Sequence, residues 1–385
     1  MQAWKMTTIA ECSTILGDGL HGTPKYDENG EYAFINGNNL HDGKIVIKPD
    51  TKRVGFREYE KYKKELTDRT VLVSINGTLG NVAVYNGEKV ILGKSACYFN
   101  VSTDCDVQFM RYVVSSPRFQ QYINSVATGT TIKNVSLKQM REYSFLIPEL
   151  EEQQRIAKVL HLLDQKIENN QKINDNLLQQ AQALYGKFFP YDVADELPAG
   201  WRIGTVGEIV EIHDSKRIPL SGAQRAKMEK RIYPYYGAAS LMDYVDEYIF
   251  DGIYLLLGED GTVVDDAGYP ILQYVWGQFW VNNHAHILTG KLGFNVESLL
   301  LLLKRTPVKS IVTGAVQPKI SQANLRSVQV VIPPQPELDV FNELIRPMFD
   351  QIRQNQDQNK ALAAMRDALL PKLMSGEVDV SAIQI

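Results

Sequence analysis

The sequence predicts an α+β protein built by duplication: two similar mixed α/β globular domains, joined and separated by two long antiparallel coiled-coil helices. Two heptad stripes of apolar residues, 185 positions apart, predict the helices. Short motifs outside the stripes recur at offsets of 181 to 197 positions, as Trp4-Lys5 does in Trp201-Arg202. Because the offset settles at 185 from Thr128 onward, we interpret all of these as one internal pseudo-two-fold repeat.

Residues 1–148 are expected to form the first globular domain. Short β-type runs such as 70–75 are broken by Gly, Asn and Asp, and a helical stretch follows at 107–126 with a break at Pro117. An extended apolar segment at 143–147 closes this domain.

Residues 149–190 are expected to form the first long helix. Its apolar positions alternate in steps of four and three, which is the spacing with which one helix packs along another. We call these positions, with their counterparts in the second helix, the helix-pair seam. In the first helix the seam comprises Ile156, Leu160, Leu163, Ile167, Asn170, Asn174, Leu177 and Leu184.

The second domain, 191–333, repeats the plan of the first. A β-type run at 248–257 precedes a helical stretch at 296–312, which Pro307 interrupts. An extended segment at 328–332 ends the domain.

The second helix is expected at 334–376, followed by a tail at 377–385. Its stripe is interrupted by Arg366, and Pro347 should kink the helix or delay its regular part until after that residue. The second part of the seam comprises Ile345, Ile352, Asn355, Asn359, Leu362 and Leu369.

The order domain, helix, domain, helix favours antiparallel pairing of the two helices. In that arrangement Asn170 faces Asn359 and Asn174 faces Asn355. Buried asparagines cost stability, but they fix register and partner choice.

The bulk composition is that of an ordinary globular protein, with 44% hydrophobic and 22% charged residues. The longest apolar run, Leu299 to Leu303, is far too short to span a bilayer, and the N-terminus lacks the apolar core of a signal peptide. Cys12, Cys97 and Cys105 form no Cys-x-x-Cys motif and are expected to be free thiols. We expect a cytoplasmic protein without a membrane partner.

The net charge of −4 is unevenly distributed. Residues 1–148 carry a net charge of +3, whereas 149–197 carry −4. This distribution permits DNA binding by the globular domains, but partners would have to neutralise part of the phosphate charge.

No catalytic constellation stands out in the sequence. It contains no Gly-x-x-x-x-Gly-Lys-Ser/Thr phosphate loop and no Gly-x-Gly-x-x-Gly fingerprint after a strand. His284 and His286 have a spacing that a metal could use on one face of a strand, but no third ligand is evident in the sequence. Gly258-Glu259-Asp260-Gly261 is interpreted as a turn, so we expect no metal site.

Polar loops are the informative part of the chain. Phe34 to Asn39 offers three amides of the kind that bind adenine edges in the major groove. The segments 130–134 and 315–319 are matching loops, each preceded by a glycine, and cations gather at Lys216-Arg217 and 225–231. Equivalent loops with different sequences predict two sites of one kind with different targets.

The whole chain resembles a specificity subunit of a type I restriction-modification system. The motifs that carry this resemblance are Trp201–Glu208, Tyr233–Ala238, Gly277–Trp280 with Asn283–Ala285, Ile147–Ile156 and Leu369–Glu377. The chain departs from the pattern at Pro334–Leu338 and at Tyr32–Ile35, where the first domain lacks the Tyr-Pro-Tyr-Tyr tract of the second. These departures suggest that the two domains have different half-sites.

The resemblance implies a non-catalytic DNA-binding subunit whose two target recognition domains each recognise half of a bipartite asymmetric site. The helices would set the spacing and dock two methyltransferase subunits, with translocase-nuclease subunits joining them. S-adenosylmethionine, ATP and Mg would bind on those partners only. The residues expected to contact double-stranded DNA are Lys25, Asn36, Asn38, Asn39, Thr78, Lys133, Asn134, Lys216, Arg217, Lys230, Gln317 and Lys319.

Two alternatives stay open at this level. One is the specificity chain of a modification-only system, without a nuclease partner. The other is a coiled-coil protein–protein scaffold without DNA binding, which would explain the acidic helices but leave the polar loops without a role.

Overall fold

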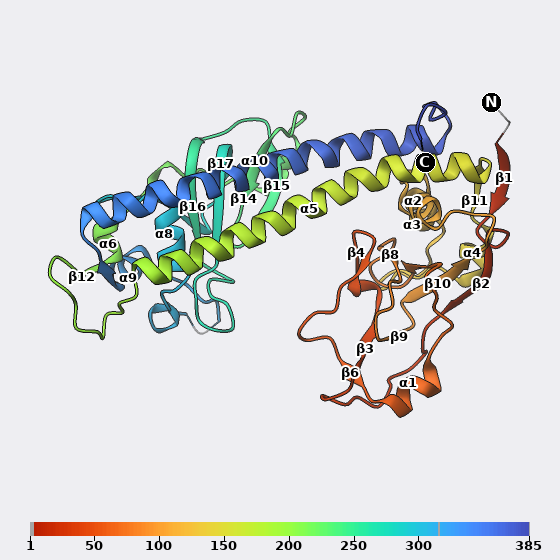
Figure 1. The fold of residues 1–385 in the computed structure, drawn as a ribbon, viewed down its shortest axis with the longest axis horizontal. Coiled ribbons are helices and arrows are strands. Elements are labelled where there is room, and N and C mark those ends of the chain that lie inside the picture. The colour runs from red at the N-terminus through yellow and green to blue at the C-terminus, as the bar shows by residue number, and fades with distance from the viewer. Residues whose placement is uncertain (1–3, 315, 385) are drawn as a thin grey trace. The chain divides into compact units, whose positions relative to one another are not determined.

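The chain divides into two compact units (Figure 1). The computed structural model describes residues 4–314 and 316–384, so the first three residues of the predicted first domain and the last residue of the predicted tail lie outside it. Unit 1 comprises Met1–Glu168 and Asn359–Ile385, and unit 2 comprises Asn169–Gln358. Each unit therefore contains one globular domain and part of each long helix.

The long helices are α5, Leu150–Phe188, and α10, Gln335–Met374. Because α10 continues through Pro347, the predicted delay of its regular part is wrong. A proline removes one backbone N–H from a helix. The side chains of Ile345 and Phe349, on either side of it, are buried, and this apolar packing holds the helix together across the proline.

The two helices are antiparallel within each unit. In unit 1, Leu160 of α5 and Leu370 of α10 lie in one buried core. In unit 2, the rings of Tyr185 of α5 and Phe341 of α10 are 5.4 Å apart. The early part of each helix thus meets the late part of the other, as the repeat predicts. All the predicted seam residues are buried or half-buried.

Buried asparagines cross-link the seam. Asn355 Nδ2 donates to Asn174 Oδ1 at 2.8 Å, which confirms this predicted pair. Asn170 Nδ2 donates to Gln358 Oε1 at 2.8 Å. Direct pairing of Asn170 with Asn359 stays a prediction.

Arg366, which interrupts the seam, belongs to an ion-pair network in unit 1. Asp164 of α5 accepts from Arg366 of α10 at 2.9 Å, from Arg111 at 2.8 Å and from the Tyr112 hydroxyl at 2.6 Å. Burial alone would raise the pKa of Asp164, but the two guanidinium groups and the phenol outweigh it and hold the pKa below its usual value. The network fastens both helices to the unit 1 domain.

The unit 1 domain consists of short strands and four short α-helices before α5. In chain order they are β1 (Lys5–Thr8), β2 (Ser13–Asp18), β3 (Tyr32–Ile35), the 3₁₀ helix η1 (Gly37–Asn39), β4 (Leu40–His41), β5 (Lys44–Ile45), β6 (Arg53–Val54), α1 (Phe56–Tyr62), β7 (Thr70–Ser74), β8 (Val82–Val84), β9 (Val90–Leu92), β10 (Ala96–Val101), α2 (Val107–Ser115), α3 (Pro117–Val126), α4 (Leu137–Glu142) and β11 (Ser144–Ile147).

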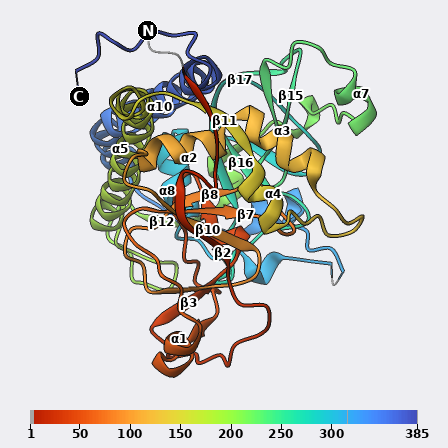
Figure 2. The ribbon, with the colours of Figure 1, turned by 90° about the vertical axis from the view of Figure 1, so that its right-hand side faces the viewer.

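The main sheet of unit 1 has the order β2-β10-β7-β8 and is antiparallel. Every residue of β7 and β10 is buried, because α2 covers one face and the smaller β6-β3-β9 sheet packs near the other. Figure 2 shows β3 and α1 at the end of this unit away from α2. The break between α2 and α3 lies where predicted: Ser116 caps α3, and Pro117 is its first residue.

The unit 2 domain repeats this plan with longer strands. Its elements are β12 (Arg202–Thr205), α6 (Val206–Ile209), β13 (Val210–Ile212), the 3₁₀ helix η2 (Asp214–Lys216), α7 (Gly222–Ala226), β14 (Tyr233–Tyr236), β15 (Leu241–Val245), β16 (Phe250–Gly258), β17 (Leu272–Val281), β18 (Ala285–Gly290), α8 (Val296–Leu303), the 3₁₀ helix η3 (Lys309–Ile311), α9 (Gln322–Ser327) and β19 (Gln329–Ile332).

Its main sheet has the order β13-β18-β16-β17-β14-β15. The helix α8 packs against β16 and β18 and is buried throughout, which explains its run of five leucines, Leu299–Leu303. The second half of the predicted helical stretch is wrong: after Leu303 only the turn η3 follows. In each unit a two-stranded sheet, β1-β11 or β12-β19, precedes the long helix.

Two bulk expectations can be compared with the structure. Cys12, Cys97 and Cys105 are all free and buried, as predicted. Among the described residues, none of the helices combines the length and apolar character that crossing a membrane would need.

Candidate nucleic-acid interface

In unit 1 the loop after β7 and the loop before α4 are joined by backbone hydrogen bonds. Gly77 N donates to Lys133 O at 2.9 Å. Thr128 and Asn134 exchange two bonds of 2.9 and 2.8 Å, which close the second loop on itself. The predicted residues Thr78, Lys133 and Asn134 are therefore brought together by the fold.

Unit 2 uses the same scheme between the loop after β16 and the loop before α9. Gly261 N donates to Pro318 O at 2.9 Å, and Thr313 and Lys319 exchange bonds of 2.8 and 2.7 Å. The correspondence extends the repeat from the sequence to individual hydrogen bonds.

A glycine makes each closed loop possible. Gly129 has a φ of +93° and Gly314 a φ of +88°. A Cβ at either position would lie 2.3 Å from a carbonyl oxygen, that of Ile132 or of Gln317. Both the conformation and the close approach require glycine at these two positions.

The side chains on this shared scaffold differ between the units. In unit 1, Thr78 and Lys133 are exposed, and Asn134 is half-buried because its Oδ1 accepts from Asn76 Nδ2 at 3.0 Å. In unit 2, Gln317 and Lys319 are exposed. The same backbone thus presents two different sets of polar groups.

A third loop of unit 1 adds amides to this surface. Asn81 Nδ2 donates to Gly37 O at 3.1 Å and ties the loop at η1 to the loop after β7. Asn38 is exposed, and Asn36 Oδ1 accepts from the Ser95 hydroxyl at 2.9 Å. Asn39 needs a correction: its side chain is 5% exposed and donates to Val46 O at 2.9 Å, so it stabilises the loop and cannot reach a base.

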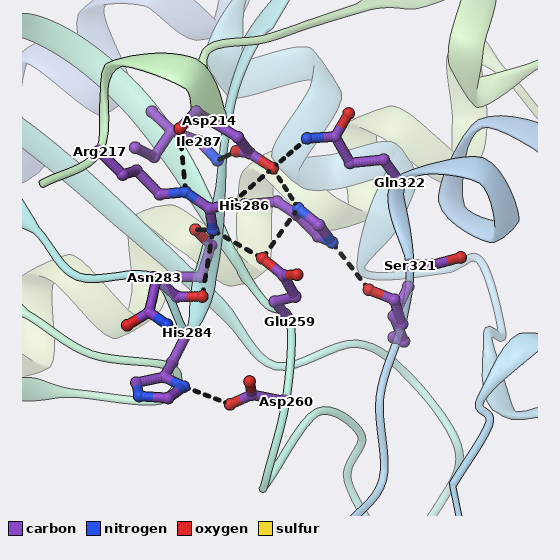
Figure 3. A network of polar contacts seen from close by, with 12 residues as sticks. Asp214, Arg217, Glu259, Asp260, Asn283, His284, His286, Ile287, Ser321 and Gln322 are labelled. Carbon is purple, nitrogen blue, oxygen red and sulfur yellow. Dashed lines mark hydrogen bonds and ion pairs between the residues drawn. The ribbon is translucent and has the colours of Figure 1, made fainter. Parts of the chain in front are cut away.

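In unit 2 the lysine of the closed loop, Lys319, joins a buried polar network through Glu259. Figure 3 shows Glu259 with Asp214, Arg217 and His286 in that network. Glu259 pairs with Lys319 at 3.2 Å and with Arg217 at 2.6 Å. Arg217 also pairs with Asp214 at 3.3 Å and donates to Ala285 O at 2.8 Å. The Arg217 side chain is only 14% exposed, so its expected DNA contact is corrected to a positioning role beneath the loops.

His286 lies at the centre of the network and is fully buried. Its Nδ1 is 2.6 Å from Asp214 Oδ2, and its Nε2 is 2.8 Å from Ile320 O. A carbonyl and an ionised carboxylate can only accept, so both ring nitrogens act as donors. The ring therefore links β18 to the strand-like segment that follows the closed loop.

The two carboxyl groups of the network stay ionised. Burial alone would raise the pKa of Asp214, but the hydrogen bond and charge of His286, with the Ile287 N–H and Arg217, lower it. Burial alone would also raise the pKa of Glu259, but Arg217, His286 and Lys319 outweigh it and bring the pKa below its usual value.

These residues also have the spacing of metal ligands. One donor atom each of Asp214, Glu259 and His286 lies within 4.8 Å of the others, so the fold places two carboxylates beside one of the two histidines. The carboxylates are already neutralised by Arg217 and Lys319, however, and a divalent cation would meet both of these charges. The geometry fits an ion-pair network better than a metal centre.

The predicted pair of histidines does not converge. His284 lies in the turn before β18, outside the regular strand, and its Nδ1 is 2.6 Å from Asp260 Oδ1 (Figure 3). His286 is within the strand and points into the network. The expectation that both lie on one strand face is wrong for this reason.

The remaining predicted residues lie elsewhere on the two units. Lys25 is exposed, and its backbone N–H binds Glu58 of α1. Lys216 is exposed at the end of η2, beside the network. Lys230 is exposed in the loop after α7.

Sequence reasoning missed Asp214 and Glu259 as members of the site. Glu259 stands in Gly258-Glu259-Asp260-Gly261, whose sequence resembles Gly77-Thr78-Leu79-Gly80 at an offset of 181, although the backbone hydrogen bonds pair Gly77 with Gly261. The sequence therefore contained an indication of the site at Glu259, but the interpretation of this segment as a turn explained the pattern equally well.

Comparisons with known proteins agree with this architecture. The family model described as "Type I restriction modification DNA specificity domain" matches twice, at residues 1–179 and 198–363. The type I restriction enzyme MjaIX specificity subunit of Methanocaldococcus jannaschii is 24% identical over 395 aligned positions, with 94% of this chain and 87% of the relative covered. A putative type I restriction enzyme specificity subunit of Haemophilus influenzae is 32% identical over 139 positions, 36% of this chain and 34% of that one.

A solved structure also has the same fold. The crystal structure of the type I restriction-modification S subunit from M. genitalium aligns with a TM-score of 0.58 at 20% identity, covering 97% of this chain and 96% of the other. At this identity the likeness shows the fold alone.

Proposed function

The chain belongs to the type I restriction-modification DNA specificity family, and we propose that each of its units recognises one half of a bipartite asymmetric DNA sequence. The observation that carries this proposal is the closed-loop scaffold. It has the same hydrogen bonds in both units but carries Asn76, Lys133 and Asn134 in one and, at the same places, Asp260, Pro318 and Lys319 in the other. One framework with two sets of side chains is what two different half-sites require.

The exposed and half-buried polar side chains divide by chemistry into two groups. Lys133 and Lys319, with Lys216, supply phosphate contacts, which position a protein on DNA without selecting a sequence. Asn36, Asn38, Asn134 and Gln317 offer amides, which form paired hydrogen bonds with adenine edges in the major groove. The buried network around Glu259 holds Lys319 at its place in the loop.

We further propose that the chain is non-catalytic and that its helices set the half-site spacing and dock methyltransferase subunits. The seam leaves the outer faces of α5 and α10 free for such partners, and the helical segments carry the negative charge of the chain. S-adenosylmethionine, ATP and Mg would then be needed on partner subunits only. Translocase-nuclease subunits would complete a restricting complex, and the protein would act in the cytoplasm.

The test is base-resolution methylation mapping in cells that express this chain with its methyltransferase subunit, compared with cells that lack the chain. We expect a new split, asymmetric, adenine-methylated motif. If the complex assembles and no new motif appears, DNA recognition by this chain is refuted and the scaffold alternative is favoured. Cleavage of unmethylated DNA with the motif would separate a restricting system from a modification-only one.

Exchange of the closed loops sharpens this test. Transferring residues 128–134 in place of 313–319 keeps the glycine and the backbone bonds but changes the side chains. We expect the half-site of unit 2 to change while that of unit 1 is retained. An unchanged motif would mean that these loops do not contact bases.

A further inference from the structure

Unit 2 contains a pocket of about 580 Å³ beside β19. Its lining includes Tyr185, Phe189, Trp201, Ile311, Val328 and Val330. None of the DNA-contacting residues proposed above belongs to this lining. The pocket has a size that proteins use to hold ligands or inserted side chains.

The corresponding place in unit 1 is filled by α3, and one shared hydrogen bond establishes the correspondence. Gln139 Nε2 of α4 donates to Val126 O, the last residue of α3, at 2.7 Å. Asn324 Nδ2 of α9 donates to Ile311 O, the last residue of η3, at 3.0 Å. Val126 and Ile311 are thus equivalent, 185 positions apart.

The start of the segment that corresponds to α3 shows that unit 2 lacks this helix. Pro117 begins α3, and its counterpart Pro307 lies 190 positions later. The two ends therefore differ by five residues, which reduces the ten-residue helix α3 to the three-residue turn η3. Of residues 308–312, Val308 alone is buried.

The lost helix carries the aromatic side chains that fill this place in unit 1. The rings of Phe119 and Tyr122 each lie 4.9 Å from the ring of Tyr143. Phe119 is fully buried. The counterpart of Tyr143 in unit 2 is Val328, which lines the pocket. The pocket is thus the space left by an aromatic helix face that unit 2 does not supply.

The segment 304–309, which contributes to the lining of the pocket, carries three basic residues. Arg305 lines the pocket, with its guanidinium 5.9 Å over the Tyr185 ring. Lys304 and Lys309 are exposed next to the lining residues, and in the described part of the chain neither forms an ion pair. Asp192 is the one acidic residue of the lining. An occupant with negative charges would therefore be favoured.

We propose that this pocket docks an acidic amphipathic helix of another protein chain. The docked helix would carry aromatic and aliphatic side chains at positions i, i+3 and i+4, like Phe119, Tyr122 and Ile123. These side chains would occupy the place that the side chains of α3 occupy in unit 1. Insertion of an amphipathic helix into an apolar groove is a common mode of protein recognition. The site concerns a protein partner and does not depend on DNA recognition by the loops.

A designed peptide tests this directly on the full chain in the absence of DNA. The probe has the sequence of residues 116–127 with R118E, and a hydrocarbon staple joins positions 121 and 125, both exposed in α3. We expect saturable binding by fluorescence anisotropy. A control peptide with F119A, Y122A and I123A should bind at least tenfold more weakly, and restoring arginine at position 118 should weaken binding further.

Three protein variants locate the binding. Ser310→Trp places an indole in the pocket and should weaken probe binding at least tenfold, whereas Ser240→Trp, at an exposed serine outside the lining, should leave it unchanged. Replacing residues 307–311 with 117–126 should raise the Tm of unit 2 and abolish binding. The proposal is overturned if the probe does not saturate, if the alanine peptide binds equally well, or if Ser310→Trp binds like the unchanged protein.

Discussion

Replacing Asp164 by asparagine tests whether the ion-pair network of the seam holds the helix pair to the unit 1 domain. Asp164 is 16% exposed and accepts from Arg111, Tyr112 and Arg366. Arg111 is only 11% exposed, so the neutral amide leaves a nearly buried guanidinium without its counter-charge. Removing one partner of a buried pair costs about 3 to 5 kcal/mol, and the residual exposure of Asp164 favours the lower figure, about 3 kcal/mol.

Urea unfolding at pH 7, followed by far-UV circular dichroism, measures this loss. For a unit of about 200 residues, 3 kcal/mol corresponds to a fall in Tm of about 6 to 12 °C. The matched control is Asp367→Asn, because Asp367 contacts the same Arg366 at 2.8 Å but is 65% exposed. An exposed pair of this kind contributes at most about 1 kcal/mol.

The pH dependence of the loss has a defined sign. The folded-state pKa of Asp164 is lowered, so its stabilisation is present above the unfolded pKa of about 3.9 and is lost as the pH falls through the lowered value. The difference between the native protein and Asp164→Asn should therefore shrink below about pH 4. A loss under about 1 kcal/mol at pH 7, or one equal to that of Asp367→Asn, would refute the structural role of the network.

Three further predictions follow from the loops and the seam. Lys133→Ala and Lys319→Ala should each weaken DNA binding by the assembled complex and reduce the slope of log K against log[salt] by about 1; unchanged slopes in filter binding would remove these lysines from the phosphate contacts. Asn174→Leu alone should lower the Tm because Asn355 loses its 2.8 Å partner. Replacing both Asn174 and Asn355 by leucine should raise the Tm and loosen the register of the helix pair. A lower Tm for the double variant would contradict this. Gly314→Ala should distort its closed loop and weaken DNA binding without lowering the global Tm by more than about 2 °C, and unimpaired binding would show that the loop geometry is dispensable.

The duplication and the helix pair were predictable because they are periodic properties of the chain. Heptad spacing places Ile156 and Leu160 on one helix face whatever the rest of the fold does. Repetition at 185 positions then implies that the second stripe has the same role. The antiparallel pairing and the Asn174–Asn355 contact followed from these two facts together with the order domain, helix, domain, helix.

The candidate site was predicted less completely, because residue type does not reveal burial. Asn39 and Arg217 have the chemistry of DNA-contacting residues, yet one is buried against the backbone and the other lies beneath the loop surface. Lys133 and Lys319 stand in matching loops, Lys319 at the place of Asn134, and there the repeat supplied the information that residue type lacked.

The sequence by itself determined that this protein consists of two copies of one domain–helix module with different polar loops, because periodicity and repetition are properties of neighbouring positions. The tertiary structure decided which polar groups are paired and which are free to bind. Asp164 pairs with Arg366, 202 positions later in the chain, and Asp214 pairs with His286, 72 positions later. Contacts between residues so far apart in the chain produce no periodic pattern in the sequence. The same holds for the pocket of unit 2, since a five-residue shortening becomes a cavity only when the surrounding helices and strands are in place.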